Sequence, residues 1–147
     1  MKTLLRKLLA VITGLALALV LVIAVEVFSS IVYPLPKDFN QTMEAMCQHV
    51  ARYPHWVLGV VVILWSGTVF VSTWVATKIG RIAAGVAVSL ILLWAVAFNL
   101  WMLPYTPWFK VVMPIGCLVA CLLGVRLGGR VSGTAATADE RTSTPAG

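Results

Sequence analysis

The chain has 147 residues, of which 61% are hydrophobic and 11% are charged, and its mean hydropathy is +0.98. A soluble globular domain carries about 25% charged residues and about 45–50% apolar ones, so this composition excludes an ordinary soluble domain. The formal net charge is +6, but the basic residues form short clusters at the ends of apolar segments. That arrangement is typical of membrane topology and argues against binding to nucleic acid.

The first predicted element is an apolar helix over about residues 8–28, preceded by the basic residues Lys2, Arg6 and Lys7. Apolar residues lie on every face of this helix, and its length suits a hydrocarbon core of about 30 Å. A secretory signal peptide begins in the same way. However, its apolar core has only about 7–15 residues, and a small-x-small cleavage site follows it. We therefore expect an uncleaved first membrane span.

The segment 29–55 is the one substantial loop between apolar segments. It opens with a stiff Tyr-Pro-Leu-Pro stretch, and a short amphipathic helix is predicted over residues 38–52. One face of this helix has apolar residues at alternating spacings of four and three: Phe39, Met43, Met46, Val50 and Tyr53. Because it is too short to span a membrane, we expect it on the bilayer surface or over the outer end of the bundle.

Three further spans are predicted over about residues 56–77, 82–103 and 108–125. Pro104 closes the third span, and Pro107 occupies the first turn of the fourth, where no N–H donor is needed. Helices are expected because backbone groups in lipid must pair within their own segment. The predicted fold class is therefore an all-α membrane protein: a bundle of four transmembrane helices with a short amphipathic helix in the first external loop.

The basic residues also predict the orientation. Four spans would place one group of them on the same side of the membrane: Lys2, Arg6, Lys7, Lys78, Arg81, Arg126 and Arg130. The opposite side would hold only Lys37, Arg52 and Lys110. The positive-inside rule then predicts cytoplasmic termini and an external loop 29–55, in a bacterial inner membrane. Residues 1–127 form the predicted transmembrane domain, and the Gly-, Ser-, Thr- and Ala-rich residues 128–147 a disordered cytoplasmic tail.

Glu26 is the one acidic residue in the predicted spans. An ionisable group in a span is costly and is functional by default. Counting along the helices places Glu26 about one turn from the outer boundary, level with Asn99 and with the basic residues Lys110 and Arg52. These four residues are the candidate polar site. Two interpretations stay open: an interfacial acid in a structural hydrogen bond, or a proton or cation site.

A second pattern lies in the fourth span, where Gly116, Ala120 and Gly124 recur at intervals of four. Small residues at this spacing let two helices approach closely. We expect this face to pack inside the bundle. The alternative is that it forms the contact between two copies of the chain.

Signatures of catalysis and of metal binding are not found. Cys47 and His49 are two residues apart on the predicted loop helix, so their side chains diverge by about 200°, and with His55 they make no four-ligand set. There is no Ser-His-Asp motif in context, no Gly-rich phosphate loop and no His-Glu-x-x-His. We therefore predict no enzyme, no cofactor and no metal site.

Several motifs together resemble a group of short bacterial four-helix membrane proteins of unassigned activity. They are Glu26 with Tyr33-Pro34-x-Pro36, and Asn99 with Met102-Leu103-Pro104-x-x-Pro107-Trp108-Phe109. The resemblance covers about residues 20–126 and implies the topology without a mechanism. Small multidrug exporters also have four helices and a lone Glu in the first, but theirs lies mid-membrane. Four-helix disulfide-generating quinone reductases use paired external cysteines, whereas this chain has Cys47.

The expected function is that of a small multi-pass membrane protein, structural or accessory, acting through helix packing. Its expected partners are the lipid bilayer and either a second copy or another membrane protein. The alternative is a small transporter or channel subunit with a polar site near Glu26 and Asn99. Whether Glu26 faces a cavity of the bundle or the lipid headgroups discriminates between the two.

Overall fold

The structure, a computed structural model, describes the backbone of residues 2–36 and 39–142 and the side chains of residues 3–36 and 39–130. This part of the chain contains no strand, and its four helices are α1 (Lys2–Val32), α2 (Met43–Ala51), α3 (His55–Met102) and α4 (Pro107–Thr142). The predicted all-α fold is thus confirmed. Three of the helices, α1, α3 and α4, are long and apolar enough to cross a membrane.

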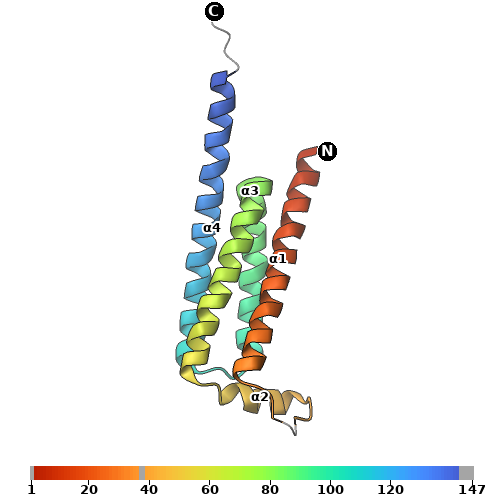
Figure 1. Cartoon of the computed structure of the whole chain (residues 1–147), viewed down its shortest axis with the longest axis vertical. Coiled ribbons are helices and arrows are strands. Elements are labelled where there is room, and N and C mark those ends of the chain that lie inside the picture. The colour runs from red at the N-terminus through yellow and green to blue at the C-terminus, as the bar shows by residue number, and fades with distance from the viewer. Residues whose placement is uncertain (1, 37–38, 143–147) are drawn as a thin grey trace, which may run out of the picture.

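The helix α3 turns back on itself at Arg81. This residue has φ 67° and ψ −176°, which is not a helical conformation, and Figure 1 shows the green part of the chain reversing direction there. The hydroxyl groups of Thr73 and Ser89 lie 3.1 Å apart, although a straight helix would separate residues 16 positions apart by roughly 24 Å. The turn therefore divides α3 into two antiparallel arms, 55–80 and 82–102.

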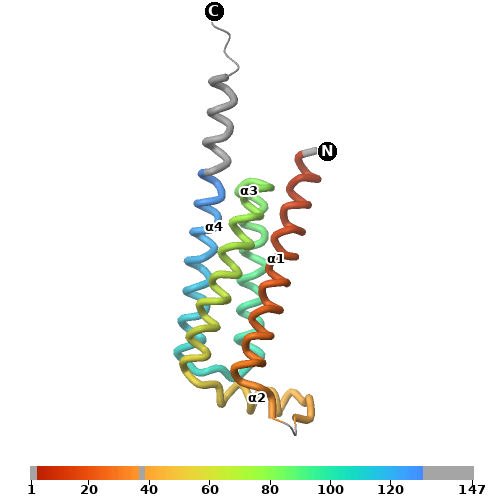
Figure 2. The backbone as a smooth tube through the Cα atoms, in the orientation of Figure 1, coloured from red at the N-terminus to blue at the C-terminus, as the bar shows by residue number. Residues whose placement is uncertain are grey.

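The two arms of α3 form the centre of a bundle. Within the described residues, α1 and α4 each pack against α3 and not against each other, as the tube in Figure 2 shows. Small buried side chains line α3 near its turn: Ser72, Thr73, Ala76, Thr77, Ala84, Gly85 and Ser89. Such residues let helix backbones approach closely. At Gly85 a Cβ atom would overlap the hydroxyl of Thr77, so only glycine fits there.

The short helix α2 lies across the end of the bundle at which α1 ends and α3 begins (Figures 1 and 2). Thr42 caps it in an extended conformation, and its hydroxyl accepts a hydrogen bond of 3.2 Å from the N–H of Ala45. Gln41, just before the cap, has a φ of 56° and so interrupts helical geometry. The helix is therefore shorter than the predicted segment 38–52, whose first residue lies outside the described part of the chain.

The connection between α3 and α4 is a tight hairpin. The N–H of Leu103 donates to the carbonyl of Asn99, and Lys110 bonds back to Thr106 in the first turn of α4. Pro107 is the first residue of α4, in the slot that needs no N–H donor. The hairpin thereby brings the last turn of α3 and the first turn of α4 together, beside α2.

The far end of α4 differs from the expectation of a disordered tail over 128–147. The backbone of α4 is helical to Thr142. Gly128 is buried, and a Cβ atom there would lie 2.7 Å from the Cβ of Thr77. The packed part of the chain therefore extends past the predicted boundary at residue 127. Residues 143–147 lie outside the described residues.

Candidate functional site

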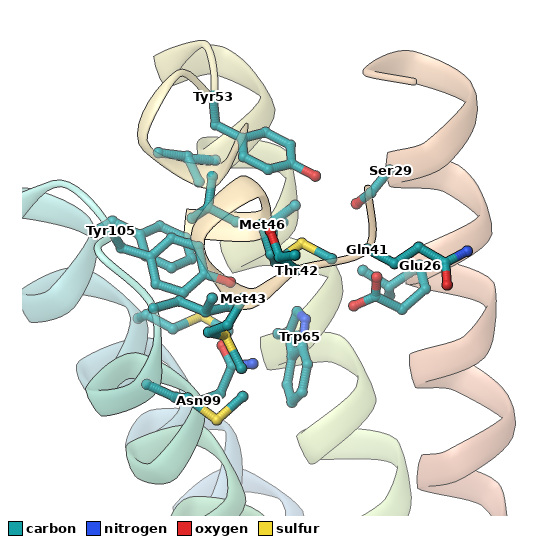
Figure 3. Close-up of a pocket in the computed structure, with 18 residues that line it drawn as sticks. Glu26, Ser29, Gln41, Thr42, Met43, Met46, Tyr53, Trp65, Asn99 and Tyr105 are labelled. Atoms are coloured by element: carbon teal, nitrogen blue, oxygen red, sulfur yellow. The ribbon is translucent and has the colours of Figure 1, made fainter. Parts of the chain in front are cut away.

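A pocket of about 370 Å³ lies at the end of the bundle that α2 covers. Its walls come from the last turns of α1, from α2, from both arms of α3 and from the beginning of α4. The loop before α2 and α2 itself form one wall, and the longer helices α1, α3 and α4 form the others (Figure 3). Segments far apart in the sequence therefore build a single site.

Two of the four candidate polar residues line this pocket, namely Glu26 from α1 and Asn99 from the second arm of α3. Figure 3 shows the Glu26 carboxylate reaching from α1 toward the space between the helices. The other two candidates, Arg52 and Lys110, are exposed and do not line it. The structure therefore brings Glu26 and Asn99 together in this pocket, whereas Arg52 and Lys110 are each adjacent in sequence to a residue that lines it, Tyr53 and Phe109 respectively.

The carboxylate of Glu26 has no ion-pair partner among the described side chains. The basic residues nearest in predicted depth, Arg52 and Lys110, are exposed and do not line the pocket. Glu26 is exposed rather than buried in the bundle. The site therefore presents an accessible carboxylate whose charge no described cation balances.

Two tyrosines on different loops share this pocket with Glu26. Burial, and then the negative charge of Glu26, raises the pKa of Tyr105 to about 12. Burial, followed by the charges of Glu26 and Tyr33, also raises the pKa of Tyr53. Both phenols therefore keep their protons at neutral pH and remain hydrogen-bond donors. The negative charge of Glu26 therefore acts on both tyrosines.

Methionines and aromatic rings supply most of the remaining lining. The chain has five methionines, and every one after Met1 lines the pocket: Met43, Met46, Met102 and Met113. The aromatic rings are those of Tyr53, Trp65, Tyr105 and Phe109. Thioether side chains are flexible and polarisable and adapt to varied ligands, and aromatic faces attract cations. A carboxylate among such groups is suited to an organic cation.

The helix α2 is held in place by a cluster of three rings. The ring of Tyr33 lies 4.7 Å from that of His49 and 4.9 Å from that of Tyr53, and the latter two are 5.4 Å apart. His55 accepts a hydrogen bond of 2.9 Å from the indole N–H of Trp108, which ties the start of α3 to the start of α4. Both histidines thus have packing partners that position the walls of the pocket.

The small-residue face of α4 points into the bundle. A Cβ atom on Gly116 would lie 2.7 Å from the hydroxyl of Ser66, and one on Gly124 would lie 3.0 Å from the carbonyl of Phe70. Ala120 between them is buried. The first arm of α3 therefore covers the face that could otherwise pair two copies of the chain.

Sequence reasoning found Glu26 and Asn99 and missed Trp65, Met102 and Met113. The apolar face of the loop helix was visible in the sequence and contains Met43 and Met46. The other lining residues lie in long apolar segments, where nothing local distinguishes a residue that faces a pocket from one that faces lipid.

The chain matches no protein-family model, no curated protein and no solved structure. This is an all-helical protein with three helices long and apolar enough to cross a membrane and with a carboxylate-containing pocket at one end of its bundle.

Proposed function

We propose that this chain is a four-span protein of a bacterial inner membrane whose external pocket binds a small organic cation. The four spans would be α1, the two arms of α3, and α4, since each arm of α3 exceeds the roughly 20 residues that a span requires. The resemblance to short four-helix bacterial membrane proteins is consistent with this topology and adds no activity to it.

The arrangement of basic residues supports cytoplasmic termini. The guanidinium group of Arg6 donates to the carbonyl of Ile79 at 2.6 Å, which places the start of α1 beside the turn of α3. Lys78 lies over the ring of Trp74, 4.3 Å from its centroid, at the same turn. The pocket is lined by α2 and the last turns of α1, and these elements lie at the opposite end of the bundle (Figure 1). The positive-inside rule then assigns the pocket to the external side.

The observation that carries the proposal is the unbalanced carboxylate of Glu26 within an aromatic and thioether lining. An ammonium group would balance this charge, and its alkyl substituents would contact the faces of Trp65 and the tyrosines. The volume of about 370 Å³ lies in the range of small-molecule sites. Hard metal cations need six or more oxygen ligands, which this mostly apolar lining does not offer.

Of the two functions expected from the sequence, this proposal develops the transporter or channel subunit with a polar site near Glu26 and Asn99. The question that separated them was what Glu26 faces, and its place in the pocket supports a binding site. The structural or accessory function would act through helix packing. The face of Gly116, Ala120 and Gly124 packs inside the bundle, as expected, and so does not offer a contact to a second copy of the chain. Catalysis forms no part of the proposal.

The test is equilibrium dialysis of radiolabelled tetraethylammonium against the purified protein in dodecyl maltoside, a detergent without charge. We expect saturable binding to the parent chain and at least a tenfold loss of affinity in Glu26→Gln. Glu44→Gln is the matched control, because Glu44 is an exposed acid of α2 that does not line the pocket. Equal affinities in the parent chain and Glu26→Gln would contradict the proposal. A parallel dialysis against Ag⁺, a soft metal ion that thioether sulfur binds, gives a second check. Binding of Ag⁺ without binding of tetraethylammonium would also contradict the proposal.

A further inference from the structure

A second cavity adjoins the pocket. It is a groove of about 520 Å³ between the outer half of α1 and the first arm of α3, with apolar walls that include Leu21, Phe28 and Ile63. Its polar residue, Thr68, is already satisfied, because its hydroxyl donates to the carbonyl of Leu64 at 2.9 Å. The groove therefore offers apolar contact, and none of the side chains that line it has an unpaired hydrogen-bonding group.

The groove and the pocket lie side by side along α1. Val25 lines both of them, and the next residue of α1 is Glu26. The groove extends toward the middle of the bundle, along about two turns of α1 and about three turns of α3. An acidic site is thus adjacent to an apolar groove that lies within the predicted depth of the membrane.

We propose that the ligand is a single-chain cationic amphiphile, an alkylammonium compound. Its head group lies against Glu26 in the pocket, and its alkyl chain lies in the groove between α1 and α3. This inference rests on the proposed function, in which the pocket binds an organic cation, and it names the class of that cation. The carboxylate selects the charged head, and the groove selects the tail.

A phospholipid fits the same two cavities less well. Its phosphate would lie close to the carboxylate of Glu26, and like charges repel one another. The external basic residues that could balance a phosphate, Arg52 and Lys110, do not line either cavity. A head group with a positive charge and no phosphate would instead be attracted to the carboxylate of Glu26.

Gly67 allows the groove to be filled without disturbing the bundle. It lines the groove, and no atom lies within 4 Å of the Cβ that a side chain would add. Gly59, about two turns earlier on the same arm, has equally open surroundings and lines neither cavity. Gly67→Leu and Gly59→Leu are therefore a matched pair. Ala24→Leu fills the groove from its other wall, on α1.

The experiment is displacement of radiolabelled tetraethylammonium by alkyltrimethylammonium ions with tails of increasing length, up to dodecyl, in dodecyl maltoside. Free concentrations are measured by dialysis, so that partition into micelles is removed. In the parent chain and in Gly59→Leu, we expect the dodecyl compound to displace the probe at least tenfold more effectively than tetramethylammonium. In Gly67→Leu and Ala24→Leu this gain should be lost, while the affinity for tetraethylammonium itself is unchanged.

The outcomes distinguish failure of the alkyl-chain site in the groove from failure of the cation site in the pocket. If the parent chain binds tetraethylammonium through Glu26 but tail length has no effect, the groove does not hold the tail and this inference is overturned alone. The same holds if both groove-filling variants keep the full gain. If the parent chain binds no tetraethylammonium, the proposed function fails, and this inference fails with it.

Discussion

The two ends of the bundle are built in opposite ways. Around the turn of α3, small residues bring the backbones together, and Gly85 has no room even for a Cβ atom. Farther from the turn, Gly59 and Gly67 of the first arm have nothing within 4 Å of an added Cβ, and a pocket lies between the last turns of α1, α2, α3 and α4 at the other end. The closed end shapes the fold, and the open end has the space and the charge that a ligand requires.

The difference extends to the side chains that fill each end. The closed end uses hydroxyl groups that bond to one another or to the backbone, such as Thr73 with Ser89 and Thr77 with the carbonyl of Thr73. The open end uses methionines and aromatic rings, and Met43 is 56% exposed. Short hydroxyl side chains fix one arrangement, whereas long thioether side chains can repack around different ligands. Substitutions should therefore affect stability at one end and binding at the other.

The largest effect is expected for Gly85→Leu compared with Gly67→Leu. At Gly85 the new side chain would meet Thr77 and force the arms of α3 apart, so we expect a loss of about 3 kcal/mol or more in the free energy of unfolding. At Gly67 the side chain enters open space, and replacing glycine within a helix is neutral or favourable. Thermal unfolding in detergent measures both. Equal losses would show that the two ends do not differ in packing.

The next effect depends on pH and concerns Tyr105 at the open end. Because its pKa is raised from 10.0 to about 12, the folded chain keeps this proton at pH values where the unfolded chain loses it. The free energy of unfolding should therefore fall as the pH rises from about 10 to about 12, by about 1–2 kcal/mol. In Tyr105→Phe this fall should be smaller by that amount. Identical alkaline profiles for the two chains would refute the burial of this phenol beside Glu26.

A smaller effect is expected for the hydrogen bond between Thr73 and Ser89. Such bonds between membrane helices contribute about 0.6 kcal/mol on average, and at most about 1.7 kcal/mol. A double-mutant cycle of Thr73→Val and Ser89→Ala should give a coupling energy in this range. A coupling energy of zero would mean that packing of small residues alone holds the two arms together.

The smallest effect on stability is expected for Glu26. Since its carboxylate has no ion-pair partner among the described residues, both Glu26→Gln and Glu26→Leu should change the free energy of unfolding by no more than about 0.5 kcal/mol. Cation binding should nevertheless be lost in both. A loss of more than about 1 kcal/mol in Glu26→Leu alone would instead indicate a structural hydrogen bond.

Hydropathy predicted the long helices because charge is excluded from membrane-crossing segments. The turn near residues 78–81 and the prolines at 104 and 107 were equally visible, since each ends or begins a helix by local chemistry. The ends of α1 and α4 were not predicted, because a helix can continue beyond the apolar segment. Gly128, for example, lies outside the predicted fourth span and still packs against Thr77.

The candidate site could be predicted in depth but not in direction around each helix. Lys110 follows Phe109, which is 2% exposed and lines the pocket, but one residue turns a helix by about 100° and directs Lys110 outward. Arg52, which follows the end of α2, is likewise exposed although the next residue, Tyr53, lines the pocket. Which face of a helix meets the pocket is decided by packing against other helices. A single sequence contains no local signal of that rotation.

The most direct test of an open, external, cation-binding end uses one exposed cysteine in intact cells, since Cys117 and Cys121 are buried. In a Cys47→Ser background, Met43→Cys places a thiol on the pocket wall, and Glu44→Cys places one beside it that does not line the pocket. A membrane-impermeant maleimide should label both, and tetraethylammonium should slow the labelling of residue 43 alone. If residue 43 is not labelled from outside, or is labelled at the same rate with and without the cation, the pocket is not an external cation site.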